Sequence, residues 1–130
     1  MPNLEEEARK FMQDKLMITE VITPDLYEKL AGETAIFPKE KALEYLALGL
    51  TSEAGEVAGK VKKLIRDGED VEGFEMKKIA ISHEIGDVLW YCAMMAKEVG
   101  VPLADIMQEN LDKLHSRKKR GTLQGSGDDR

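Results

Sequence analysis

The spacing of apolar residues in the middle of the chain most limits what it can fold into. Between residues 39 and 66 apolar side chains recur every three or four positions, and residues 75–99 repeat the pattern. A helix has about 3.6 residues per turn, so each pattern gathers its apolar residues on one face. No segment shows the alternation typical of a half-buried strand. We therefore expect an all-α protein.

Two further helices are expected to flank this pair. Thr23 and Pro24 form a typical helix start, because threonine caps the first turn and proline suits the first helical position. They predict a helix over residues 23–35, and the segment after Gly100 predicts another over 103–117. The apolar residues of this last helix, such as Leu111, are expected to point inward. Short loops between neighbouring helices favour a four-helix bundle.

The length of the chain, 130 residues, fits one domain. We expect residues 23–117 to form the helical domain and residues 1–22 to be an N-terminal extension with a short helix. Residues 67–73 are acidic and contain glycine, which predicts a polar loop. The basic, glycine-rich tail, 118–130, is expected to be flexible.

Composition excludes several classes of protein. The net charge of −6 is opposite to that of a general nucleic-acid binder, so no nucleic-acid partner is expected. No apolar run approaches the roughly 20 residues of a membrane span, and the N-terminus does not resemble a signal peptide. The single cysteine cannot form an internal disulfide. A cytoplasmic protein is the expectation.

Two short strings carry the chemistry. Glu53 and Glu56 stand three residues apart in one expected helix, and Glu84 and Asp87 stand three apart in the next. This spacing places both acids of each pair on one side of a helix, at the edge of its apolar face. Partly desolvated carboxylates repel one another and need a cation. Their hard oxygen atoms suit Mg²⁺ or Mn²⁺.

The order of several strings along the chain is similar to that of the MazG-like nucleotide pyrophosphohydrolases, an all-α family. The match runs from about Leu26 to the C-terminus. The strings are Thr34-Ala-Ile-Phe-Pro38, Leu48-Gly-Leu-Thr-Ser-Glu-Ala-Gly-Glu-Val57, His83-Glu-Ile-Gly-Asp-Val-Leu-Trp-Tyr91, Asn110-Leu-Asp-Lys-Leu114 and the tail Arg117-Lys-Lys-Arg-Gly-Thr-Leu-Gln-Gly-Ser-Gly-Asp-Asp-Arg130.

This resemblance implies a reaction and a set of roles. It implies Mg²⁺-dependent cleavage of a nucleoside triphosphate to the monophosphate and pyrophosphate, with non-canonical nucleotides as one substrate class. The metal ligands would be the four acids, Glu53, Glu56, Glu84 and Asp87. Asn110 and Lys113 match positions near the triphosphate. The family works as a homodimer or homotetramer, with sites near subunit contacts. Many members carry a further acid where this chain has Ser52.

Other residues are candidates through their own chemistry. Glu53 or Glu56 could accept the proton of the attacking water. Arg117 and Lys60 could stabilise negative charge on phosphate, although surface cations of helices are more often solvated. Tyr91 shares a face with the second pair of acids, and Phe37 lies within the first string of the resemblance. These two are candidates for contacts with the base or ribose, with core packing as the alternative.

Three other functions fit parts of the pattern. One is a phosphoribosyl-ATP pyrophosphohydrolase-like enzyme, which uses similar helices and metal chemistry. Another is a non-catalytic helical dimer that binds a nucleotide or a partner protein, against which the intact acid strings argue. The third is a di-iron bundle, suggested by Asp112 and His115, but that pattern requires two Glu-x-x-His strings and the chain has none.

Overall fold

The computed structural model describes residues 3–68 and 71–130, and within them the protein is all-α, without a strand. This confirms the expected fold class. The helices, one of them a short 3-10 turn, are α1 (Leu4–Gln13), α2 (Pro24–Gly32), η1 (Lys39–Lys41), α3 (Ala42–Asp67), α4 (Val71–Val99) and α5 (Leu103–Arg120). No helix in the described residues combines the length and apolar character needed to cross a membrane.

Local signals explain where these helices begin and end. The Thr23 hydroxyl accepts a hydrogen bond from the backbone N–H of Leu26, 3.1 Å away, as the predicted cap requires. Gly100 and Gly121 follow α4 and α5 with φ of 74° and 69°. Left-handed backbone of this kind favours glycine, so each helix ends there.

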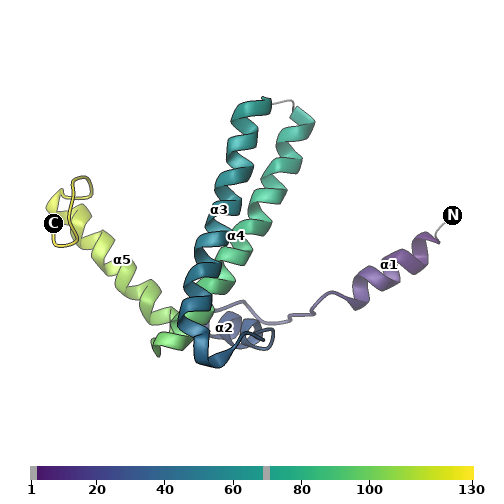
Figure 1. Ribbon diagram of the computed structural model, residues 1–130, viewed down its shortest axis with the longest axis horizontal. Coiled ribbons are helices and arrows are strands. Elements are labelled where there is room, and N and C mark those ends of the chain that lie inside the picture. The colour runs from purple at the N-terminus through teal and green to yellow at the C-terminus, as the bar shows by residue number, and fades with distance from the viewer. Residues whose placement is uncertain (1–2, 69–70) are drawn as a thin grey trace.

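Helices α3 and α4 form a long hairpin that dominates the molecule (Figure 1). Helix α2 packs across the base of this hairpin, mainly against α4. Helix α5 leaves the base at a wide angle, while α1 stands away on the opposite side (Figure 1). Within the described residues α5 contacts α2 and α4 but not α3. The hairpin therefore presents one long flank that α5 of the same chain does not cover.

The core is small and lies at the base, where the helices meet. Leu46, Ala93 and Met94 are buried there, and aromatic rings from α2, α4 and the segment between α2 and η1 pack around them. The apolar face of α5 was expected to point inward, and this was wrong: Leu111 is 60% exposed. Exposed with it are Ile106, Met107 and Leu114. Because α5 diverges from the hairpin, the described part of the chain leaves much of this face uncovered.

Several predicted boundaries differ from those observed. The loop expected over 67–73 is shorter, because α4 already begins at Val71 and includes Gly73; residues 69–70 lie outside the described residues. The apolar period of the helix continues into this acidic stretch and outweighs the single glycine. Helix α2 ends at Gly32, earlier than 35, and α5 continues through Arg120 rather than ending at 117.

Candidate metal centre

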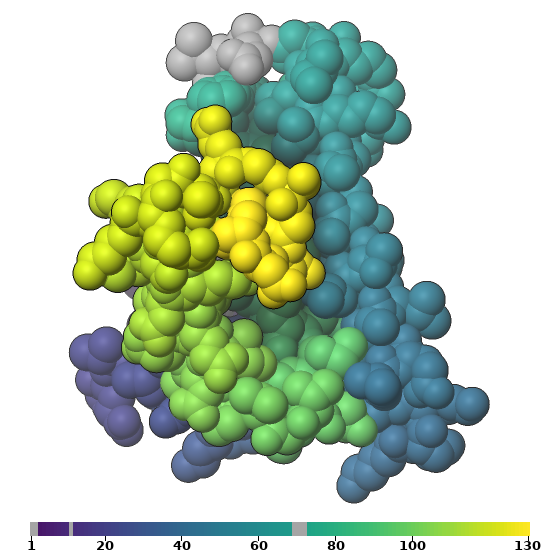
Figure 2. All heavy atoms as spheres, turned by 90° about the vertical axis from the view of Figure 1, so that its left-hand side faces the viewer, coloured from purple at the N-terminus to yellow at the C-terminus, as the bar shows by residue number. Residues whose placement is uncertain are grey.

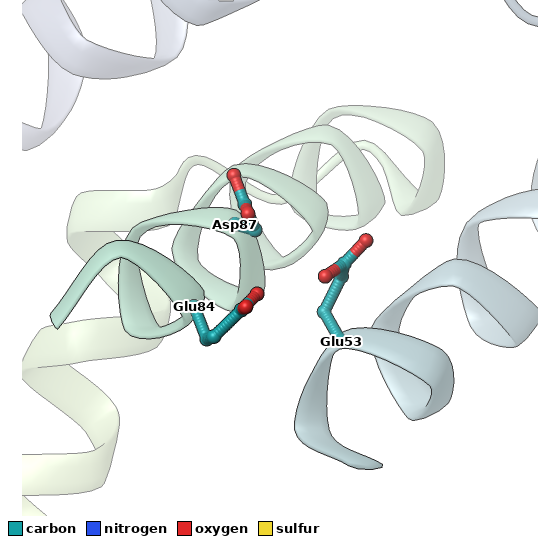
Figure 3. Close-up of side chains that lie close together, drawn as sticks. All are labelled: Glu53, Glu84 and Asp87. Carbon is teal, nitrogen blue, oxygen red and sulfur yellow. The ribbon is translucent and has the colours of Figure 1, made fainter. Parts of the chain in front are cut away.

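Three carboxylates from two helices meet at one point along the hairpin (Figure 3). Glu53 comes from α3, and Glu84 and Asp87 come from α4. Each offers an oxygen atom, and these atoms all lie within 4.8 Å of one another. The spacing of three residues on α4 directs both of its acids toward α3, where Glu53 faces them. Such a group of oxygen ligands fits a divalent cation.

The electrostatics of this triad favour a bound cation. The pKa of Glu53 is raised above its usual value, first by partial burial and then by the negative charges of Asp87, Glu84 and Glu56. Each ionised acid therefore destabilises the others, and a divalent cation between them would reverse that effect.

A lysine already neutralises part of this charge. The Nζ atom of Lys60 lies 2.9 Å from Oε1 of Glu84, and both side chains are partly buried. The hydrogen bond to Glu84 raises the pKa of Lys60, and the charge of Glu84 adds to the effect. Lys60 was a candidate for contacts with phosphate. In the structure it lies on α3 beside the acids and pairs with Glu84.

The fourth expected ligand, Glu56, lies just outside the triad. It is on α3, one turn after Glu53, and its side chain is exposed. Its charge still reaches the site, since it contributes to the raised pKa of Glu53. The structure therefore brings three of the four predicted acids together and places the fourth beside them.

A hollow of about 340 Å³ opens next to two of the acids. Its lining consists of Thr34, Glu53, Asp87, Trp90 and Tyr91. The indole N–H of Trp90 donates a hydrogen bond to the Thr34 hydroxyl oxygen at 2.8 Å. The Trp90 and Tyr91 rings meet edge to face, with centroids 4.9 Å apart. Aromatic walls beside carboxylates suit a ligand with a flat apolar part and an anionic part bridged by metal.

Tyr91 is fixed by its neighbours on α3. Its ring lies against Gly49, in the space that a side chain there would fill. Burial raises the pKa of Tyr91, and the neighbouring Tyr45, which is hydrogen bonded to it, contributes as well. The phenol therefore stays protonated beside Glu53 and Asp87.

Phe37 lies behind this wall rather than in the hollow. Its ring stacks on Tyr45 with centroids 5.6 Å apart and meets Trp90 edge on at 6.4 Å. It lines a different hollow together with Met94 and Lys97. Its position supports the aromatic wall from the core side.

The predicted residues of α5 do not join the acids within one chain. Asn110 and Lys113 are exposed on α5, which makes no contact with α3 in the described residues. Arg117, also on α5, is buried against the C-terminal tail.

Sequence reasoning missed Thr34, Trp90 and Gly49 as parts of the site. All three lie inside strings that carry the family resemblance, so their positions were visible. Their roles depend on contacts between segments: Trp90 reaches Thr34 across 56 residues of sequence. Helical periodicity within one segment cannot show such a contact.

The fold and the triad together define an all-helical protein with a carboxylate site suited to a divalent cation. The family model for the MazG nucleotide pyrophosphohydrolase domain matches residues 41–122. The chain belongs to this family. It is also 45% identical over 112 residues to the "Gene 37 protein" of Mycobacterium phage L5, a match that covers 82% of this chain and 97% of the phage protein. No solved structure matches.

Proposed function

We propose that the protein hydrolyses a nucleoside triphosphate to the nucleoside monophosphate and pyrophosphate. The convergence of Glu53, Glu84 and Asp87 in a member of this family carries the proposal. These three residues would hold Mg²⁺, or Mn²⁺ as a substitute, and Glu56 would lie beside the bound cation. Bound there, the cation would neutralise triphosphate charge and polarise the phosphoryl oxygens.

The other groups at the site have separate tasks in this proposal. Glu56 accepts the proton of the attacking water, because it lies next to the triad without belonging to it. Lys60 stabilises negative charge on the phosphates once the cation competes for Glu84. Trp90 and Tyr91 form the wall against the base and ribose.

The triphosphate end of the site requires a second copy of the chain. We propose a homodimer or homotetramer in which α5 of one copy lies beside the hairpin of another and supplies Asn110 and Lys113. Large exposed apolar side chains on both surfaces support this, among them Leu48 on α3 and Leu111 on α5. Arg117 is engaged by the tail of its own chain, so we leave it out of this group.

The test is product analysis after incubation with a panel of canonical and modified nucleoside triphosphates, with and without Mg²⁺. Metal-dependent release of monophosphate and pyrophosphate supports the proposal. Glu53→Gln and Asp87→Asn should abolish turnover while helix content stays the same. Glu44→Gln, an exposed acid of the same helix α3, is the matched control and should remain active.

Two other outcomes would redirect the proposal. Turnover of phosphoribosyl-ATP alone would assign the chain to the narrower pyrophosphohydrolase class. No turnover of any triphosphate or of phosphoribosyl-ATP, with Mg²⁺ or Mn²⁺ present, would contradict catalysis and leave a nucleotide-binding or partner-binding helical protein. Sedimentation velocity tests the assembly, and a monomer at working concentration would contradict the shared site.

A further inference from the structure

The C-terminal tail folds back on the end of α5 and is held there by arginines. The Arg117 guanidinium donates to the carbonyl oxygen of Asp128 at 2.8 Å, and that of Arg120 to a main-chain oxygen of Arg130 at 2.9 Å. Arg130 in turn donates to the carbonyl oxygen of Gly127 at 2.6 Å. Figure 2 shows the resulting yellow cap beside the end of α5. These hydrogen bonds place the tail along the end of α5.

One arginine of this cap, Arg117, is buried without a carboxylate side chain beside it in the described residues. Arg117 is only 7% exposed, which is unusual for a cation. Among the described residues, no aspartate or glutamate carboxylate lies within ion-pair distance of Arg117 or Arg130. Asp128 and Asp129 belong to the same segment, but their side chains are exposed. A buried guanidinium whose partner is a neutral carbonyl keeps most of its desolvation cost.

Three polar atoms in the cap also lack a hydrogen-bond partner. They are Nε of Arg117, Nε of Arg130 and Oγ1 of Thr122, each buried. Both Nε atoms can only donate, and the threonine hydroxyl can donate as well. A water molecule would satisfy such donors but would leave the positive charge in place. An anion with several acceptor oxygens satisfies the donors and offsets the charge together.

We propose that the tail is an anion site that binds a phosphate group through Arg117, Thr122 and Arg130. Phosphate oxygens match the planar donor fork of arginine, and a hydroxyl completes such sites. The group could be inorganic phosphate, pyrophosphate or the phosphate of a nucleotide. Within one chain this site is separate from the triad, because α5 does not contact α3 in the described residues and the tail stands apart from the hairpin (Figure 1). It does not rest on the proposed hydrolysis.

The test is isothermal titration of the full-length protein with inorganic phosphate, pyrophosphate and a nucleoside monophosphate, each in excess EDTA. Chelation leaves the triad without a cation, and its negative charge then repels these ligands. We expect saturable binding of one phosphate group per chain. Thr122→Val, which removes only the hydroxyl, and Arg117→Lys should weaken it at least about tenfold, because each removes a hydrogen bond to a charged group.

Two controls separate this site from general charge and from the triad. Lys119→Gln removes a positive charge from an exposed neighbour of Arg117 and should change affinity by less than about twofold. Glu53→Gln should bind phosphate like the wild type even if it abolishes hydrolysis. The relative affinities of the three ligands show whether the site prefers inorganic phosphate, pyrophosphate or the phosphate of a nucleotide.

Other results would overturn the proposal. These are an absence of saturable binding, or equal binding by the wild type and Thr122→Val. Equal loss in Lys119→Gln would indicate a diffuse charge effect instead. If Arg117→Lys loosens the tail, limited proteolysis will show it, and Thr122→Val then decides the outcome. Saturable binding of an acidic peptide, without binding of phosphate, would instead assign the cap to a protein partner.

Discussion

The ring of Tyr91 on α4 lies directly against the backbone of Gly49 on α3. A Cβ atom at position 49 would overlap the ring. The two helices are thus in close contact next to the triad, and Tyr91 lines the same hollow as Glu53 and Asp87. The glycine is required here for space, because it lies inside a regular helix.

Gly49→Ala should therefore disturb the wall of the hollow. The added methyl group must displace the ring or separate the helices, and overpacking of this kind costs about 1–3 kcal/mol. Alanine favours the helix over glycine by about 1 kcal/mol, so the net change in unfolding free energy is a loss or close to zero. We expect kcat/KM for the best triphosphate to fall more clearly than stability. Urea unfolding and steady-state kinetics measure the two effects.

Gly59→Ala is the matched control for this change. Gly59 is on the same helix, and nothing lies within 4 Å of a Cβ placed there. Only the helix preference then remains, so we expect a gain of up to about 1 kcal/mol in stability and unchanged kinetics. Equal effects of the two substitutions would mean that Tyr91 does not depend on Gly49.

Lys60→Gln should separate metal binding from substrate binding. The ammonium group of Lys60 holds Glu84 and repels a divalent cation, so its removal should tighten Mg²⁺ binding. KM for the triphosphate should rise, because a phosphate-facing charge is lost. The pair is partly exposed, so the change in unfolding free energy should stay below about 1 kcal/mol. Titration with Mn²⁺ measures the affinity for metal, and steady-state kinetics measure KM.

The control for this prediction is Lys62→Gln, an exposed lysine on the same helix without an ion pair in the described residues. This substitution should change neither the affinity for metal nor KM by more than about twofold. If Lys60→Gln weakens Mg²⁺ binding, Lys60 supports the acids instead of competing for them.

Divalent metal should stabilise the fold through the triad. A cation that binds only the folded protein adds about 2.7 kcal/mol at a concentration one hundred times its Kd. Thermal unfolding should therefore shift upward with Mg²⁺ or Mn²⁺ and return with EDTA. Asp87→Asn should lose most of the shift, whereas Glu44→Gln should keep it. An equal shift in both variants would place the bound metal elsewhere.

Much of this arrangement could be predicted because it depends on local periodicity. The three-residue spacing of Glu84 and Asp87 fixes their common face, and the apolar stripes predict the pairing of α3 with α4. The direction of α5 could not be predicted in this way. Its apolar residues have the same spacing as those of a core helix, and only packing shows that Leu111 is uncovered in one chain.

Contacts between distant segments could likewise not be predicted from helical periodicity. The burial of Arg117 depends on the tail turning back through Gly125 and Gly127, whose φ values of 121° and 91° few other residues adopt. A sequence shows that these glycines permit a turn but not which side chain the turn encloses. The same limit applies to Glu56, which is one helical turn from Glu53 but lies outside the triad.

The raised pKa of Glu53 predicts a pH dependence of stability in the absence of metal. Partial burial, followed by Asp87, Glu84 and Glu56, raises the pKa of this group in the folded state above its ordinary value of 4.5. The folded protein therefore keeps the proton to a higher pH than the unfolded chain does. Between these two pKa values the contribution of Glu53 to stability falls as the pH rises, and it is fully present only below the lower one.

Glu53→Gln removes this dependence, since glutamine does not titrate. In EDTA, its stability relative to the wild type should increase from acidic to neutral pH and level off above the folded-state pKa. Urea unfolding of both proteins across that range measures the difference. With saturating Mg²⁺ at neutral pH the order should reverse, because ionised Glu53 then binds the cation. A parallel pH profile for Glu53→Gln and the wild type would contradict the unfavourable charge that the triad places on Glu53.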